Sequence, residues 1–278
     1  MKKTLLVVGV VLVVRTAFAG VEYEFRQTMH SDVEGIPSSD FAGRAVIEGD
    51  HSRVDFLSGT AFPPGTYVVL SNGARTQTWV DPSKKSYVEI NTGSVASAIG
   101  ASHITIGNKK INVEKLADHP TIAGFETAHF RLTLSYDVTV PFSQIPLKQS
   151  VATTVDKWTT DAYAGIATSF LGDGVLKTGN ADVDELIDAE NTRIHGFALK
   201  EVVNVTTIND MPQLPGTKLP ISRTRTQTRE LTITSIQAKA EIPAATFAVP
   251  AGFHRADPLR DDSQKAPLHV LSMEPAAH

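Results

Sequence analysis

Residues 43–90 decide the fold class, and they read GRAVIEGDHSRVDFLSGTAFPPGTYVVLSNGARTQTWVDPSKKSYVEI. Short runs of β-branched and aromatic residues alternate in this segment with residues that favour turns. Asn72-Gly73 is a strong hairpin signal, while Gly49-Asp50 and Asp81-Pro82 mark further turns. The segment therefore predicts an antiparallel meander with strands at residues 44–48, 52–57, 66–70, 74–80 and 86–90.

Residues 128–140 carry the clearest strand pattern of the chain. Apolar side chains stand at every second position from Phe130 to Val140, and polar side chains fill the positions between them. One wet face and one buried face are typical of an antiparallel sheet. Gly107-Asn108-Lys109 is expected to form a turn between two strands. Strands besides these are expected at residues 21–29, 103–106, 110–116, 148–158, 194–208 and 221–240.

Helical spacing of apolar residues predicts a helical insert at about residues 160–191. Its first part, residues 161–171, ends where a glycine-rich turn begins. In its second part, residues 180–191, Asp182 and Glu185 are placed to cap a short helix. We therefore expect the insert to interrupt a sheet and to pack on one of its faces.

These elements together predict one mainly β domain over residues 20–253. A curved antiparallel sheet is expected to hold the short helical insert on its concave face. Residues 92–100 are weakly helical and add one or two turns at most. Residues 254–278 show no periodicity and are expected to form a disordered tail.

Residues 1–19 have the features of a secretory signal peptide. Lys2 and Lys3 precede an apolar run, and Ala17-Phe18-Ala19 provides small residues for cleavage after Ala19. The apolar run is too short to span a bilayer comfortably. We therefore expect the mature protein to begin at Gly20 and to be periplasmic or secreted, without a membrane span.

Composition narrows the classes of partner. The chain has no cysteine, which excludes both a disulfide framework and a lipid-anchor cysteine at the mature N-terminus. Removal of residues 1–19 takes away three of the 26 basic residues and no acid, which leaves 23 against 30 and a formal charge of −7. An acidic surface argues against nucleic acid and anionic membrane as main partners.

The sequence shows no motif for catalysis or for a cofactor. The nine histidines lack the spacing of a metal site, and no G-x-S-x-G elbow is present. Asn180, Asp182 and Asp184 faintly suggest a calcium loop, but carboxylates at a helix N-terminus are the simpler interpretation. Residues 174–179 have the spacing of a P-loop but lack its lysine. We therefore predict a protein that is not an enzyme, with no cofactor and no metal.

Two features are candidates for binding. The alternating apolar row either lines a ligand cavity or forms core against the insert. The arginines of residues 221–240 form a stripe that either contacts a lipid headgroup or protein partner, or pairs with acids of neighbouring strands. The cavity candidates are Phe130, Leu132, Leu134, Tyr136, Val138, Ile166 and Phe170, and the stripe consists of Arg223, Arg225 and Arg229.

Several motifs resemble a family of secreted bacterial proteins known as a domain of unknown function. They include a G-x5-G-D-x2-R-x2-F run from Gly43 to Phe56, a W-x-D-P-x-K-K-x-Y run from Trp79 to Tyr87, residues 122–130, and F-x-V-P-A-G-F at residues 247–253. The family is similar in layout to periplasmic lipoprotein carriers and outer-membrane lipoprotein receptors. The resemblance implies an unclosed antiparallel β-barrel wrapped over helices, with an apolar cavity.

These observations predict a periplasmic or secreted, non-catalytic protein. It would bind a lipid, an acyl chain or a lipoprotein in the concavity of its half-barrel. The alternative is an interaction or sensor module of the cell envelope, which uses the sheet edge and the arginine stripe to bind another protein.

Overall fold

The structure is a computed structural model that describes residues 20–32, 36–101, 104–142, 145–163, 166, 177–210, 224–239 and 241–256. The first strands of its main sheet are β1 (Gly20–Ser31), β2 (Ser39–Glu48), β3 (His51–Gly59), β4 (Tyr67–Ser71), β5 (Thr76–Asp81) and β6 (Ser86–Asn91). The later ones are β7 (Thr105–Lys115), β10 (Ala128–Phe142), β11 (Ile145–Thr160), β12 (Phe197–Asp210), β13 (Thr224–Lys239) and β14 (His254–Arg255). The remaining elements are a β8 (Thr121–Ile122) and β9 (Phe125–Glu126) pair, helices α1 (Thr92–Ala101) and α2 (Ala181–Arg193), and 3-10 turns η1 (Asp161–Tyr163) and η2 (Ala244–Phe247).

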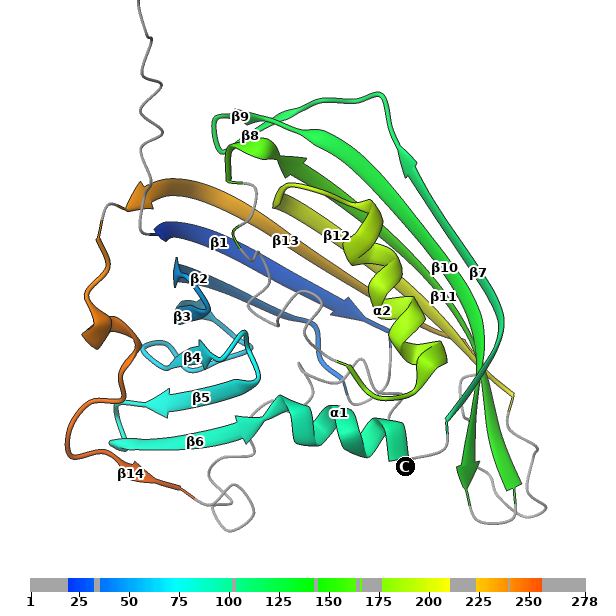
Figure 1. The fold of residues 1–278 in the computed structure, drawn as a ribbon, viewed down its shortest axis with the longest axis horizontal. Helices are drawn as coiled ribbons and strands as arrows, with labels where there is room; N and C mark the ends of the chain where they lie inside the picture. The colour runs from blue at the N-terminus through cyan, green and yellow to red at the C-terminus, as the bar shows by residue number, and fades with distance from the viewer. Residues whose placement is uncertain are drawn as a thin grey trace, which may run out of the picture.

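The main sheet is curved and open. Its strand order is β14-β6-β5-β4-β3-β2-β1-β13-β12-β11-β10-β7, so its two edges are β14 and β7 (Figure 1). Neighbouring strands pair antiparallel, except that β14 runs parallel to β6. The predicted class, a mainly β protein with an unclosed, barrel-like sheet, is confirmed.

The meander predicted from residues 43–90 is present as β2 to β6. Between β4 and β5 the chain turns through Asn72, Gly73 and Ala74 at positive φ values of 54°, 62° and 64°. Asparagine and glycine adopt this left-handed conformation more readily than other residues. β2 starts at Ser39, within the loop expected over residues 31–41, because its backbone pairs with β1 as far as Met29.

The turn predicted at Gly107-Asn108-Lys109 was wrong, because β7 runs through these residues without a break. Asn108 has a φ of 52°, and the register between β7 and β10 shifts at Ser135 and Asp137. A β-bulge inserts one extra residue into a strand and bends it. The turn-favouring residues thus form a bulge in an edge strand.

The helices occupy the concave side of the sheet and its open mouth. α1 follows β6 and leads to β7, so it connects the two halves of the sheet, and α2 lies within the curve (Figure 1). α2 confirms the helix predicted in the second part of the insert. Its N-cap is Asn180 and not Asp182, because the Asn180 Oδ1 accepts hydrogen bonds from the Asp182 and Val183 amides. Of the helix predicted at residues 161–171, the described residues show only η1 and Ile166, and the rest lies outside them.

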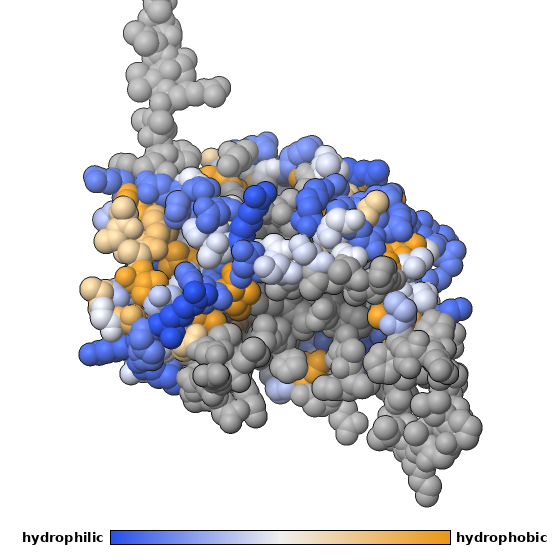
Figure 2. Space-filling model, turned by 60° about the horizontal axis from the view of Figure 1, so that its bottom comes forward, coloured by the Kyte–Doolittle hydropathy of each residue, from blue (hydrophilic) through white to orange (hydrophobic). Residues whose placement is uncertain are grey.

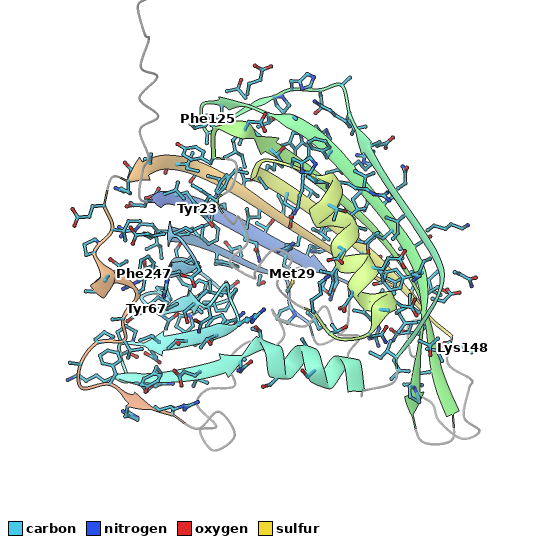
Figure 3. All side chains as sticks on the ribbon, viewed as in Figure 1. Tyr23, Met29, Tyr67, Phe125, Lys148 and Phe247 are labelled. Atoms are coloured by element: carbon cyan, nitrogen blue, oxygen red, sulfur yellow. The ribbon has the colours of Figure 1, made fainter. Side chains whose placement is uncertain are left out.

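The tail was expected to begin at His254, but His254 and Arg255 form β14. The preceding segment brings them there, because Phe247, Val249 and Phe253 pack against Tyr67, Val69 and Val80 on the outer face of the sheet. Figure 3 shows Tyr67 and Phe247 side by side. Residues 1–19 and 257–278 lie outside the described residues, so the signal peptide and the remaining tail stay predictions.

The main core fills the concave face of β1 to β4. It contains a chain of aromatic contacts, in which Phe41, Phe56 and Phe62 have ring centroids 4.0–5.6 Å apart. From the other end of the chain, Phe197 contacts Tyr23 and Tyr163. We call this the aromatic core: Val21, Tyr23, Phe25, Phe41, Ala45, Ile47, Val54, Phe56, Phe62, Val68, Leu70, Tyr163, Phe197, Leu199 and Ile233.

Candidate functional site

A second apolar cluster lies on the concave face of β7, β10, β11 and β12. Strand register brings Val113, Leu132, Val155 and Val203 into one row across the four strands. Leu132 is fully buried, while Val155 and Val203 are 5% and 8% exposed. The row is therefore closed to solvent on β10, β11 and β12, whereas Val113 on the edge strand β7 is half-buried. It forms the base of the cluster.

The next row toward the open end of the sheet is less buried. Register aligns Ile111 with Leu134 and, across Thr153, with Val205. These three apolar side chains are only half-buried although they pack against the base row. We call the two rows together the apolar strip: Ile111, Val113, Leu132, Leu134, Val155, Val203 and Val205.

Helix α2 lies beside this apolar strip and is attached to β7 mainly by charges. The Lys109 Nζ donates to Asp182 at 2.6 Å and to Glu185 at 2.5 Å. Ile194, just after the helix, packs against the strip. These attachments lie at partly exposed side chains, and such ion pairs contribute little to stability. The helix therefore lies against the β7 side of the strip, with Ala189 buried and with ion pairs near its N-terminus.

The ends of the two helices meet at one close backbone contact. A Cβ atom added at Gly100 in α1 would lie 2.0 Å from the Thr178 carbonyl oxygen. The Asn180 side-chain amide also donates to the Ile104 carbonyl at 2.8 Å. α1 and the start of α2 thus form a joint that closes one side of the concavity.

Three charged side chains stand on the concave face between the aromatic core and the apolar strip. Glu201 on β12 accepts from Lys157 on β11 at 3.0 Å and from Arg229 on β13. Burial raises the pKa of Glu201, but the attraction and hydrogen bonds of the two cations outweigh burial and hold it below its usual range. We call Lys157, Glu201 and Arg229 the charged belt.

The structure places most of the predicted binding residues on this face. Phe130, Leu134 and Tyr136 are half-buried there, and Leu132 and Val138 are buried. Burial raises the pKa of the Tyr136 hydroxyl. Ile166 packs instead against the aromatic core, next to Tyr163. Phe170 lies outside the described residues.

Two of the three arginines of the predicted stripe, Arg225 and Arg229, lie on the same concave face. Arg225 and Arg229 pair in register with Thr207 and Val203 of β12, and they alternate in phase with Leu231 and Ile233. Arg229 pairs with an acid of the neighbouring strand, as one of the two interpretations predicted. Arg223 lies outside the described residues.

Sequence reasoning missed Lys157 and Glu201. Both occur in strands predicted correctly, at positions in phase with Val155 and Val203. This alternation could have shown that the two charged residues lie on the buried face, where a charge needs a partner. The partner could not be predicted, because it depends on which strands are neighbours in the sheet.

The outer face of the sheet carries a separate polar cluster. His129 is 5% exposed, stacks on Trp158 with ring centroids 4.1 Å apart, and lies 2.7 Å from Asp118 and 3.0 Å from Asp156. Arg131 binds Asp156 with two hydrogen bonds. Burial raises the pKa of Asp156, but the hydrogen bonds and charges of Arg131 and His129 outweigh burial and hold the pKa below its usual range. These side chains satisfy one another and attach the β7–β10 connection to the sheet.

Two surface hollows lie away from the apolar strip. One of about 510 Å³ is bordered by residues of β7, β10, β11 and β12 that include the predicted cavity residue Tyr136 as well as Asp137 and Ile208. The other, of about 490 Å³, lies beside Arg44, Arg53 and Thr246 of η2. Among the described residues, no His, Cys, Asp and Glu side chains form a group that could hold a metal. In the same ranges, neither helix has the length and hydrophobicity of a membrane span.

Figure 2 turns the bottom of the molecule toward the viewer and shows hydrophobic side chains that gather mainly at the left of the view, among hydrophilic ones. No family model and no curated protein matches the sequence. Among solved structures, the chain is similar to a LolA superfamily protein from Nitrosomonas europaea, with a TM-score of 0.28 and 8% identity over 82% of this chain and 90% of that one. A similarity this low says nothing about function.

Proposed function

We propose that this protein is a non-catalytic carrier or receptor that binds a hydrophobic or lipid-modified ligand on the apolar strip. We place it in the periplasm or outside the cell, after cleavage of residues 1–19. The resemblance to the secreted domain-of-unknown-function family supports the same proposal but remains a prediction.

One observation carries the proposal. The sheet face that is filled by aromatic rings at β1 to β4 leaves Ile111, Leu134 and Val205 half-exposed beside α2. Apolar side chains that are exposed to water in a concave place mark binding sites for apolar groups. Because α2 is attached by partly exposed ion pairs, it can shift without unfolding the sheet.

Co-purification tests the proposal directly. The full chain is produced in a bacterium that has a periplasm, and the soluble periplasmic fraction is purified for native mass spectrometry and solvent extraction. We expect an acyl-bearing compound bound to the wild-type protein. In Leu134→Asp the bound compound should be lost, because a carboxylate on the apolar strip repels a hydrocarbon chain.

A matched control separates this effect from general damage. Leu57 lies on the outer face and is 52% exposed, so Leu57→Asp should keep the bound compound. Wild-type protein that carries no acyl compound, and that takes up no added fluorescent fatty-acid analogue, would contradict the proposal.

The second candidate function is docking of an envelope protein on the arginine stripe. The position of Arg225 and Arg229 on the concave face favours a ligand inside the sheet over a partner outside it. Pull-down with Arg225→Glu and Arg229→Glu distinguishes the two. Loss of a protein partner with retention of bound lipid would favour the docking function.

A further inference from the structure

The apolar strip has cations along one side. Arg225, Gln227 and Arg229 follow one another on the concave face of β13, directly beside Thr207, Val205 and Val203 of β12. A separation of four residues along a strand is about 13 Å. Arg229 is therefore level with the base row of the strip, and Arg225 is level with the row just beyond its outer row, on the strand next to β12.

The charges on this face do not cancel. On the concave faces of β11, β12 and β13, Arg225, Arg229 and Lys157 contribute three positive charges and Glu201 contributes one negative charge, which leaves an excess of two positive charges on these three strands. The whole chain has a formal charge of −4. This part of the concave face thus has a sign opposite to that of the protein as a whole, while α2 brings Asp182 and Glu185, which pair with Lys109 of β7.

Of these cations, Arg225 has the fewest hydrogen-bond and ion-pair partners within the described residues. Within the ranges that the structure describes, it has neither a hydrogen bond nor an ion pair from its side chain, and it is only half-exposed. Arg229 directs its Nη2 at Glu201, and a guanidinium has five N–H donors in all. Partly desolvated arginine beside apolar side chains is stabilised by an anion that it can bind in a two-bonded geometry.

We propose that the ligand is an anionic amphiphile, whose acyl chain lies on the apolar strip and whose carboxylate or phosphate group binds Arg225. Arg229 supplies a second positive charge, while Glu201 keeps it in place. This inference rests on the proposed function and adds the chemical class of the headgroup.

Binding of a matched series of amphiphiles tests the headgroup. The probes share one chain and differ only at the head: dodecanoate, dodecyl phosphate, dodecanol and dodecyltrimethylammonium. Calorimetry on the purified chain from Gly20, below the aggregation concentration of each probe, gives the affinities. We expect the two anions to bind about tenfold or more tightly than dodecanol, since one charge-assisted hydrogen bond is worth that much. The ratio between carboxylate and phosphate then identifies the headgroup.

Variants assign the effect to Arg225. Arg225→Gln should lower the affinity for the anions to that for dodecanol and leave dodecanol unchanged, and Arg225→Lys should retain part of the preference. Arg44→Gln is the matched control, because Arg44 is an arginine on the outer face with 46% of its side chain exposed. It should change none of the affinities.

Each outcome decides between the two proposals. Equal affinities for all headgroups, or a loss in Arg225→Gln that is equal for dodecanoate and dodecanol, would overturn the anionic headgroup and leave the apolar ligand standing. Failure of every probe to bind the wild-type protein would overturn the proposed function itself, and the headgroup with it.

Discussion

On the concave face of β1 to β4, aromatic rings fill the available space, whereas on β7 and β10 to β12 the same face carries aliphatic side chains that remain half-exposed. Phe56 and Phe62 stack at 4.0 Å in the first region, and Phe56 is fully buried. In the second region Leu132, Val155 and Val203 are buried, whereas Val113 and the row through Leu134 are half-buried. The charged belt lies where the two regions meet.

The difference shows that one continuous sheet is tightly packed in one region and only partly covered in another. Tightly packed rings leave no room for a ligand, and a smaller side chain there would leave a cavity that destabilises the fold. The half-buried aliphatic side chains beside α2 contribute less to stability, and they form the surface on which we propose that an apolar ligand binds. The comparison can be tested by changing each region in turn.

The largest effect is expected in the aromatic core. Phe56→Ala should lower the free energy of unfolding by about 4 kcal/mol, because it removes a fully buried ring that stacks on Phe62 and Trp79. Denaturant titration measures the change. Leu57→Ala, at the exposed neighbouring position, should change stability by no more than about 0.5 kcal/mol. Equal losses in the two variants would refute the assignment of this region as core.

Substitution in the charged belt should give the second largest loss of stability. Glu201→Gln leaves Lys157 and Arg229 close together without a counter-charge, so we expect a loss of about 3 kcal/mol. Glu230 binds Lys200 on the outer face with 44% of its side chain exposed, so Glu230→Gln should cost about 1 kcal/mol or less. Similar losses would mean that the belt is as well solvated as the outer face.

Low pH should reduce the stability of the folded protein through one carboxylate on each face of the sheet, Glu201 on the concave face and Asp156 on the outer face. The pKa values of Glu201 and Asp156 are lowered in the folded protein, so each stabilises it above the unfolded-state pKa of about 4. That contribution is lost as the pH falls below 4 and through the folded-state values. Unfolding measured between pH 7 and pH 3 should show this decline, and Glu201→Gln should make it shallower. An unchanged slope in this variant would contradict the pKa shift.

The apolar strip should give the smallest effect on stability. Leu134→Ala should cost about 1 kcal/mol, because its side chain is half-exposed, whereas Leu132→Ala in the buried row should cost about 3 kcal/mol. Binding of a fluorescent fatty-acid analogue should show the opposite ranking, with the greater relative loss in Leu134→Ala. If Leu134→Ala costs as much stability as Leu132→Ala, the whole strip is closed core.

Much of the fold follows from short-range patterns. The strands of residues 43–90 and the long strand from Ala128 were predicted because alternation and turn residues act within a few positions. The bulge at Asn108 was missed, since a turn-favouring residue does not show whether the chain reverses or merely bends. β14 was missed as well, because a two-residue strand has no pattern of its own and depends on Phe247 and Phe253 packing upstream.

The sequence by itself determined that this is a mainly β protein with an alternating apolar strand at Phe130 to Val140, because alternation is a local property of the chain. Only the tertiary structure decided that this row is closed at Leu132 and half-open at Leu134, and that Arg225 and Arg229 share its face. Burial and charge pairing depend on the curvature of the sheet and on strand neighbours such as β12 and β13. These neighbours are set by contacts between segments far apart in the chain, and no local pattern encodes them.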